Sequence, residues 1–216
     1  ARRYERGELL DADDFTDPAA TERGWVYELK DAGEAVRKPL LRDGWLRAEP
    51  YSAVWRRRAG DGPVIYTFDC RPVPKDPARP ETITDAIFFF QASWYNLPFD
   101  FFIRKHYDER HSVYGDLQGY WLDWGGNGNR TTRLRKLPYR QLLLQSIAPE
   151  DQLKPGRIHA VEMLCADSEL RFSADGRVIL QCFDLTPYRS GHFGMLGFVR
   201  ATEIRNFKVY RARLVE

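Results

Sequence analysis

Hydrophobic and polar residues alternate with a period of two along most of this chain. Such alternation predicts β-strands, because successive side chains of a strand point to opposite faces of the sheet. Turn-forming pairs such as Asp43-Gly44 and Asp175-Gly176 separate the alternating runs. The runs that predict strands are residues 25–29, 44–49, 52–57, 64–70, 85–92, 119–124, 131–137, 159–164, 169–173, 177–183, 192–199 and 204–211.

Many short strands without a long helical pattern indicate an all-β protein. Residues 1–216 fit one domain, which we expect to be a two-sheet antiparallel β-sandwich of the jelly-roll type. One face of each strand should then be buried against the opposite sheet. The residues expected to be buried are Trp25, Ile65, Tyr66 or Phe68, Ile87, Phe89, Leu134, Val161, Phe193 and Phe207.

Two segments interrupt the alternation. Residues 71–81 are charged and rich in proline, as in a surface loop. Residues 93–116 are long, aromatic and contain histidines. Loops of that length inside a compact domain are usually functional or disordered, and the aromatic content argues against disorder. We therefore expect residues 93–116 to contribute to a functional site.

The charge balance and the cysteines exclude several classes of protein. Lys and Arg number 33 against 31 Asp and Glu, so the net charge of +2 gives no reason to expect a nucleic-acid partner. No apolar run reaches the ~18 residues of a membrane span. A start at Ala1 leads us to expect a secreted or periplasmic protein, and we expect a monomer. Cys70, Cys165 and Cys182 lie in apolar runs, which favours buried free thiols over a disulfide, although one bridged pair remains an alternative.

The stretch GYWLDWGGNGNRTTRLRK, residues 119–136, predicts a β-hairpin. Asn127-Gly128 suits a tight turn, because both central positions of such turns need a positive φ angle. In the returning strand Arg133 and Arg135 lie two residues apart, so both should point to one face. Asn129 and Arg130 add further polar groups at the turn. We expect this hairpin to present a cationic ledge to a polar ligand.

Several segments resemble the concanavalin A-like lectin and glucanase superfamily of jelly rolls. The C-terminal part contains two strands around Asp175-Gly176, then Gly191-His192-Phe193-Gly194 and a closing strand with Asn206-Phe207. The N-terminal part contains Asp14-Phe15 and Asp43-Gly44-Trp45-Leu46. More narrowly, the chain is similar to an uncharacterised bacterial branch found among polysaccharide-degradation genes, through the segments Thr84–Ala92, Gly119-Tyr120, Gly125-Gly126-Asn127 and Thr131–Arg135. The resemblance implies a jelly-roll fold and a carbohydrate ligand.

Jelly-roll glucanases carry two glutamates on one strand, since retaining hydrolysis needs two carboxyl groups ~5–5.5 Å apart. The chain has no such pair, and its strand carboxylates Asp69, Asp85, Asp123 and Glu162 are isolated in sequence. Each is expected to be a hydrogen-bonded strand or turn residue. Hydrolysis would need carboxylates from separate strands to meet.

Cleavage of a uronate-containing polysaccharide by β-elimination needs a base and a group that neutralises the carboxylate. Residues 101–121 and the hairpin contain histidine, tyrosine, arginine and asparagine, which suit these roles. We expect a polysaccharide lyase without a required cofactor. The catalytic candidates are His106, His111 and Tyr120; the substrate-binding candidates are Trp94, Asn96, Arg110, Trp124, Asn127, Asn129, Arg133 and Arg135. We expect the ligand face to carry Tyr120 together with an arginine.

Three other functions stay open. They are a glycoside hydrolase with carboxylates from separate strands, a non-catalytic carbohydrate-binding module or lectin, and an enzyme that cleaves 3-keto-glycosides. The resemblance also implies a structural calcium ion near the chain ends, for which Asp13, Asp14, Asp17 and Asn206 are candidate ligands, although no catalytic metal is expected.

Overall fold

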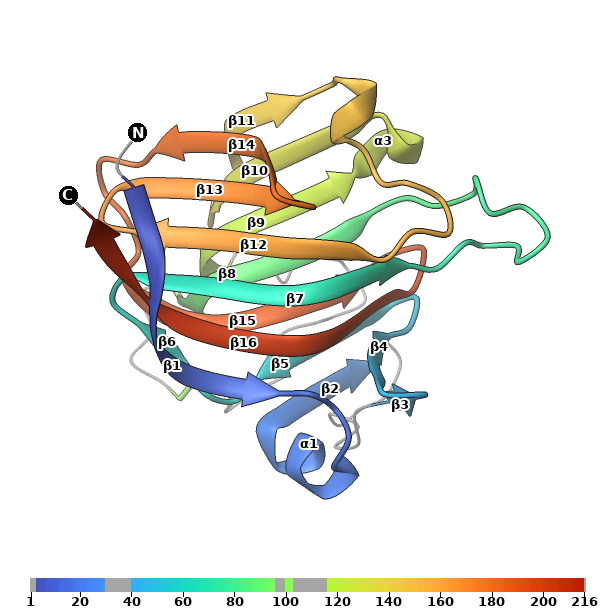
Figure 1. The fold of residues 1–216 in the computed structure, drawn as a ribbon, viewed down its shortest axis with the longest axis horizontal. Helices are drawn as coiled ribbons and strands as arrows, with labels where there is room; N and C mark the ends of the chain where they lie inside the picture. The colour runs from blue at the N-terminus through green and yellow to red at the C-terminus, as the bar shows by residue number, and fades with distance from the viewer. Residues whose placement is uncertain (1–2, 30–39, 96–99, 103–115, 216) are drawn as a thin grey trace.

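The computed structural model describes residues 3–29, 40–95, 100–102 and 116–215. In these ranges nearly all regular structure is β-strand, arranged in two stacked antiparallel sheets (Figure 1). The strands are β1 (Arg3–Asp13), β2 (Trp25–Leu29), β3 (Leu40–Arg42), β4 (Trp45–Ala48), β5 (Ser52–Arg56), β6 (Gly60–Asp61), β7 (Val64–Pro72), β8 (Ala86–Trp94), β9 (Leu117–Gly125), β10 (Thr131–Leu137), β11 (Gln141–Ser146), β12 (His159–Ala166), β13 (Glu169–Ala174), β14 (Arg177–Phe183), β15 (Ser190–Gly197) and β16 (Thr202–Val215). The helical segments are α1 (Pro18–Gly24), α3 (Gly126–Asn129) and the 3-10 turn η1 (Pro149–Asp151). The predicted all-β sandwich is confirmed.

Sheet A has the strand order β14-β13-β12-β7-β16-β4-β3, and β1 pairs with β16. Sheet B has the order β11-β10-β9-β8-β15-β5-β2, and β6 pairs with β15. In Figure 1 sheet A, with β7 and β16 at its centre, lies in front of sheet B. No helix within the described ranges has the length and apolar character of a membrane span.

Aromatic rings fill the space between the two sheets. Phe193 and Phe207 come from different sheets, and their ring centroids lie 4.9 Å apart. Trp25 meets both of these rings edge-on. Every residue that was expected to be buried is buried. Three of them, however, lie outside the space between the sheets. Ile87 and Phe89 belong to a second apolar cluster on the outer face of sheet B, and Ile65 belongs to a small cluster on the outer face of sheet A.

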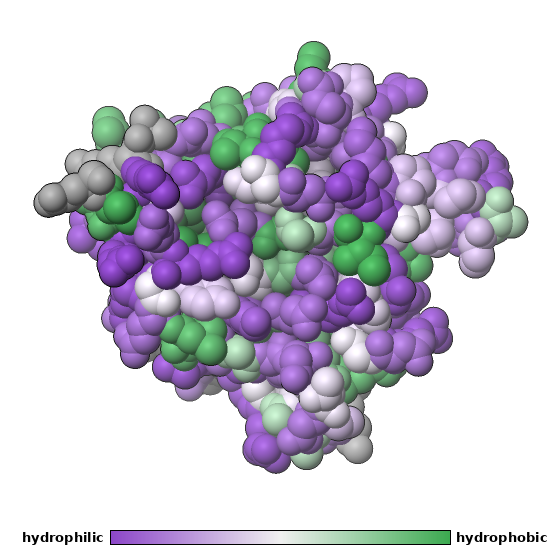
Figure 2. All heavy atoms as spheres, in the orientation of Figure 1, coloured by the Kyte–Doolittle hydropathy of each residue, from purple (hydrophilic) through white to green (hydrophobic). Residues whose placement is uncertain are grey.

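The outer face of sheet A is polar. Arg6 Nη2 lies 2.9 Å from Glu162 Oε2, and Arg205 Nε lies 3.0 Å from Asp69 Oδ2. Figure 2 shows this side of the molecule as mostly hydrophilic, with small separate apolar patches. The three cysteines are free thiols, of which Cys70 and Cys165 are buried. The expected buried free thiols are thus confirmed for two of the three.

A β-bulge interrupts β8 at Gln91. This residue has a φ of 51°, and the pairing with β9 shifts between Phe90 and Ser93. A Cβ atom on Gly119 would lie 2.8 Å from the Gln91 carbonyl oxygen, so glycine is needed there on the neighbouring strand. Before the bulge the even-numbered Phe90 points into the core; after it the even-numbered Trp94 belongs to the outer cluster. The bulge therefore turns Trp94 to the outer face of sheet B.

The expected position of Tyr120 on the ligand face is wrong. Tyr120 pairs with Lys136, and its side chain is fully buried between the sheets. Its hydroxyl donates to Asp184 Oδ2 at 2.7 Å and accepts from the Tyr188 backbone N–H at 3.1 Å. Lys136 Nζ lies 2.8 Å from the same carboxylate. The hydroxyl thus holds the segment that follows β14, and it does not reach the outer face of sheet B.

We expect Tyr120→Phe to lower the free energy of unfolding by about 1–3 kcal/mol, because it removes a hydrogen bond to the Asp184 carboxylate and leaves the Tyr188 backbone N–H without its acceptor. Urea unfolding of the purified variant measures this change. Tyr139→Phe is the matched control, since Tyr139 is 81% exposed. Equal stability of the two variants would contradict the structural role of Tyr120.

Candidate functional site

A pocket of about 260 Å³ opens on the outer face of sheet B, next to the β9–β10 hairpin. We call it the sheet B pocket. It combines two carboxylates, two arginines, an asparagine and three apolar or aromatic walls, which is the mixture expected of a polar ligand site. The residues that line it are Asp85, Ile87, Trp121, Asp123, Asn127, Arg133, Arg140 and Phe198.

The register of three neighbouring strands brings these side chains together. Arg133 of β10 lies opposite Asp123 of β9, which lies opposite Ile87 of β8. Directly paired residues of antiparallel strands point to the same face. Two positions further along, Arg135 lies opposite Trp121. The prediction that Arg133 and Arg135 share a face is confirmed by this register.

The hairpin turn has the predicted backbone conformation. Asn127 and Gly128 have φ angles of 55° and 69°, and both belong to α3. A Cβ atom on Gly126 would lie 2.6 Å from Asp123 Oδ2, so only glycine allows the turn to lie against this carboxyl group. Asn127 consequently reaches the rim of the sheet B pocket.

Asp123 is a buried carboxyl group at the centre of the sheet B pocket. It is 6% exposed, and its Oδ2 lies 3.9 Å from Arg133 Nη1. Among the described residues its Oδ1 has no hydrogen-bond partner. Burial, and next the nearby Asp85 carboxylate, raise the pKa of Asp123 to about 6, against the opposing effect of Arg133 and Arg135. Asp123 therefore holds or releases a proton near neutral pH.

Asp85 is the second carboxyl group of the sheet B pocket. It precedes β8, where its backbone N–H donates to the Gly125 carbonyl at 3.2 Å. Burial raises the pKa of Asp85, although its hydrogen bond with Thr84 Oγ1 opposes the shift. Two carboxyl groups from separate segments of the chain thus border one pocket, which is an arrangement that acid–base chemistry uses.

Arginines surround the Trp121 ring. The guanidinium carbons of Arg135 and Arg140 lie 5.7 and 5.5 Å from its centroid. Arg133 donates from Nε and Nη2 to Thr131 Oγ1, which orients its guanidinium group. Burial and the like charges of Arg133 and Arg140 lower the pKa of Arg135. Such mutual repulsion would be relieved by an anion bound between these arginines.

Two of the expected ligand-binding residues stabilise the fold instead. Trp124 is buried between the sheets, and its Nε1 donates to the Asp151 carbonyl at 2.9 Å. The Asn129 side chain donates to the Leu153 carbonyl and accepts from the Leu153 N–H. Trp124 shares the inward face with Tyr120 because the two lie an even number of residues apart. The prediction that Trp124 and Asn129 bind the ligand is therefore wrong.

Trp94 lies on the correct face but is buried. Its Nε1 donates to the Phe101 carbonyl at 3.1 Å, and the two rings pack 5.9 Å apart. Phe101 in turn meets Trp55 edge-on at 5.2 Å. The chain on both sides of residues 103–115 thus belongs to the outer cluster of sheet B, which also contains Leu117. The remaining candidates Asn96, His106, Arg110 and His111 lie outside the described residues.

Several pocket residues escaped the sequence-based prediction. Trp121 was detectable, because it alternates with Asp123 along one strand and pairs with Arg135. Arg140 comes from the β10–β11 turn and Phe198 follows β15, so only the three-dimensional fold brings them to the sheet B pocket. Neither carries a local signal in the sequence.

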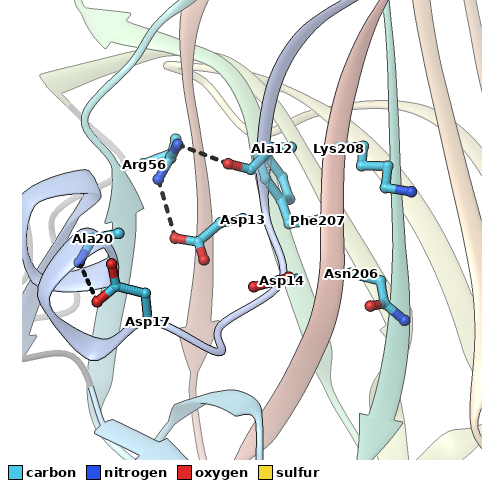
Figure 3. Close-up of a pocket in the computed structure, with 9 residues that line it drawn as sticks. All are labelled: Ala12, Asp13, Asp14, Asp17, Ala20, Arg56, Asn206, Phe207 and Lys208. Carbon is cyan, nitrogen blue, oxygen red and sulfur yellow. Dashed lines mark hydrogen bonds and ion pairs between the residues drawn. The ribbon is translucent and has the colours of Figure 1, made fainter.

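The candidate calcium ligands lie together at a second pocket, of about 370 Å³ (Figure 3). Asp13, Asp14, Asp17 and Asn206 all line it. Asp13 accepts hydrogen bonds from the Phe15 N–H and from Trp25 Nε1.

Hydrogen bonds within the chain occupy the other carboxylates at this pocket. Asp14 accepts from Thr16, and Asp17 accepts from the first backbone N–H groups of α1. The guanidinium group of Arg56 pairs with Asp11 at 2.7 Å and contacts Asp13 at 3.5 Å. In the part of the chain that the structure describes, no group of three His, Cys, Asp or Glu side chains is arranged to hold a metal ion. Because Arg56 already pairs with Asp11 and contacts Asp13, we expect no calcium ion at this pocket.

A family model described as a domain of unknown function, DUF6250, matches residues 47–207. The chain belongs to the DUF6250 family. The matched range includes every residue that lines the sheet B pocket. No curated protein sequence matches the chain.

Solved structures share the fold of this DUF6250 protein. A Bacillus subtilis protein of unknown function with a galectin-like fold aligns over 99% of this chain and 100% of its own, with a TM-score of 0.76 and 18% identity. An endo-beta-1,3-glucanase from Pyrococcus furiosus aligns over 99% and 97%, with a TM-score of 0.61 and 11% identity. The carbohydrate-binding module CBM66 from Bacillus subtilis aligns over 87% and 95%, with a TM-score of 0.55 and 10% identity. The expected concanavalin A-like jelly roll is confirmed, and at these identities the likeness shows the fold alone.

We expect Asp123→Asn to raise the free energy of unfolding at about pH 8, by up to about 3 kcal/mol, and to change little at about pH 4. The native pKa near 6 lies above the ordinary value of 3.8, so the wild-type protein loses stability as pH rises through this interval. Asparagine removes the cost of ionising a buried carboxyl group. Urea unfolding across pH measures the difference, with the exposed Asp61→Asn as control. Parallel stability curves for Asp123→Asn and wild type would contradict the raised pKa.

We expect removal of divalent cations to leave the melting temperature unchanged, because Arg56 already neutralises the acidic residues near the N-terminus. Differential scanning calorimetry before and after dialysis against a chelator tests this. A fall of several degrees that calcium alone reverses would show that a metal ion binds despite the arginine.

Proposed function

We propose that the protein is a carbohydrate-active enzyme that cleaves an acidic, uronate-containing glycan by β-elimination in the sheet B pocket. The observation that carries this proposal is a group of three arginines at one place: Arg133 and Arg140 line the sheet B pocket, and Arg135 and Arg140 lie over the Trp121 ring. An indole ring offers an apolar surface to the C–H face of a sugar, and arginine pairs with carboxylates through two parallel hydrogen bonds. Together they suit a sugar that carries a carboxylate.

β-Elimination removes the proton on the carbon next to the carboxylate and breaks the bond from the neighbouring carbon to the glycosidic oxygen. The electron pair of the broken C–H bond becomes a carbon–carbon double bond, and the leaving oxygen takes up a proton. Arg133 and Asn127 line the pocket where they can neutralise the carboxylate and so make the proton more acidic. Asn127 adds an amide N–H donor for the same oxygen atoms.

The base remains a proposal. His106 and His111 are the candidates, and they lie outside the described residues. Phe101 and Leu117, which lie on either side of these residues in the chain, both belong to the outer cluster of sheet B. Both flanking residues thus lie on the face where the sheet B pocket opens. Tyr120 is removed from the catalytic set, because its side chain is buried between the sheets.

The structural neighbours support a carbohydrate as ligand, since they include an endo-beta-1,3-glucanase and a carbohydrate-binding module. They do not distinguish cleavage from binding, because one jelly-roll fold serves several functions. The argument for an acidic substrate therefore rests on the arginines of the sheet B pocket. A secreted or periplasmic location is part of the proposal.

Glycoside hydrolysis is the second candidate, and the pair of Asp85 and Asp123 favours it. Hydrolysis needs one carboxylic acid to protonate the leaving oxygen and one carboxylate to act as base or nucleophile. A pKa of about 6 would let Asp123 carry the acid proton near neutral pH. This reaction would produce a new reducing end without a carbon–carbon double bond.

Incubation with a panel of acidic polysaccharides tests the function. We expect a product that absorbs ultraviolet light as an unsaturated uronate. Reducing ends without that absorbance would assign hydrolysis, and binding without either product would assign a carbohydrate-binding module. Failure to bind any acidic glycan would overturn the proposal.

Arg133→Ala and Arg135→Ala should each lower kcat/KM at least about tenfold, which corresponds to about 1.4 kcal/mol. The physical reason is the loss of a charge-assisted contact to the substrate carboxylate in a partly buried site. Arg79→Ala removes the same charge from an exposed loop, where Arg79 pairs with the exposed Glu81, and this variant should retain full activity. Equal activity of all three variants would exclude the sheet B pocket as the substrate site.

A further inference from the structure

The sheet B pocket presents a charge conflict for the proposed substrate. Its lining residues include two carboxyl groups, Asp85 and Asp123, and two guanidinium groups, Arg133 and Arg140. With both carboxyl groups ionised these charges sum to zero, so the lining would give an anionic sugar no net attraction. If one carboxyl group holds a proton, the same lining has a net charge of +1.

Asp123 is the carboxyl group placed to hold that proton. Its side chain is more than nine-tenths buried, and its Oδ1 has no hydrogen-bond partner among the residues that the structure describes. Its Oδ2 faces Arg133 at 3.9 Å, beyond hydrogen-bond distance. A buried carboxylate oxygen that accepts no hydrogen bond destabilises the protein. A protonated carboxyl group, in contrast, can donate a hydrogen bond to a ligand.

We propose that Asp123 binds the substrate carboxylate as a protonated carboxylic acid, so that the sheet B pocket takes up a proton together with an acidic sugar. This inference rests on the proposed function, because it names how the anionic group is held. The O–H of Asp123 donates to one carboxylate oxygen, and Arg133 contacts the same group. Asp123 takes this proton from solvent when the ligand binds and releases it to solvent when the ligand dissociates.

The groups around Asp123 act in opposite directions. Asp85 precedes β8, and its negative charge favours the protonated form of Asp123. Arg133 and Arg135 of β10 favour the ionised form. Arg140 of the β10–β11 turn lines the same pocket, and Arg200, which follows β15, interacts with Asp85. Burial has the largest effect and brings the pKa of Asp123 to about 6.

The test measures binding of galacturonate, glucuronate and mannuronate oligosaccharides by isothermal titration calorimetry between about pH 5 and pH 8. For the wild-type protein we expect the Kd to rise about tenfold for each pH unit above the pKa of Asp123. At the upper end of this range binding should take up about one proton, which titrations in buffers of different ionisation enthalpy report.

The variant Asp123→Asn tests the effect of protonation while the hydrogen-bond donor is kept, because the amide N–H donates from the same position and does not titrate. This variant should bind with little dependence on pH and should take up no proton. Asp61→Asn, at an exposed position of β6, should behave as wild type.

The outcomes distinguish the two levels of the proposal. Binding that is independent of pH in the wild-type protein, or proton uptake that persists in Asp123→Asn, overturns the role of Asp123 while the proposed function stands. Absence of binding to all of these oligosaccharides at every pH overturns the proposed function and this inference with it. If Asp123→Asn does not fold, proton uptake by the wild-type protein alone decides, since its absence contradicts the proposal.

Discussion

The register between β8, β9 and β10 is the constraint on which the candidate site depends. In this register Ile87, Asp123 and Arg133 form one row across the outer face of sheet B, and Trp121 and Arg135 lie in the next. A slip by one residue would exchange the two faces of a strand, placing a carboxylate between the sheets and a core aromatic in solvent. The aromatic core therefore selects the register, and the register in turn positions the polar groups. The pairing of β8, β9 and β10 thus determines both the packing of the core and the geometry of the site.

The glycines and the bulge around these strands have a shared physical reason. Gly126 allows the hairpin turn to lie against the Asp123 carboxyl group, and Gly119 allows β9 to approach the distorted backbone of Gln91. At both positions the absence of a side chain lets the glycine backbone approach its neighbour closely. The bulge then adds Trp94 to the outer cluster beneath Phe101. The bulge thus places Trp94 in the outer cluster that also contains the pocket residue Ile87.

The sequence pattern was sufficient for the fold, because alternation and turn residues are local signals. Strand β10 has its predicted bounds, and Asn127-Gly128 has the predicted turn conformation. Strand β11 was missed, since the run QLLLQS does not alternate, and β1 was missed because most of its side chains are exposed. Alternation also showed that Tyr120 and Trp124 share a face. It could not show which face is the core, because Trp121 is as aromatic as its neighbours, and the assignment to the ligand side was consequently wrong.

The residues that escaped prediction show why a site is harder to infer than a fold. Asp85 and Asp123 lie far apart in the sequence and meet only because β8 pairs with β9. Each alone has the pattern of an ordinary strand or turn carboxylate, and only their joint burial raises both pKa values. The nearby arginines offset the cost of burying Asp123 only in part, since its Oδ1 has no hydrogen-bond partner among the described residues. A fold selected for stability alone would replace this carboxyl group by an apolar residue, as buried polar groups without partners are costly. A buried carboxyl group among arginines and beside Trp121 is what the proposed binding of an acidic sugar would require.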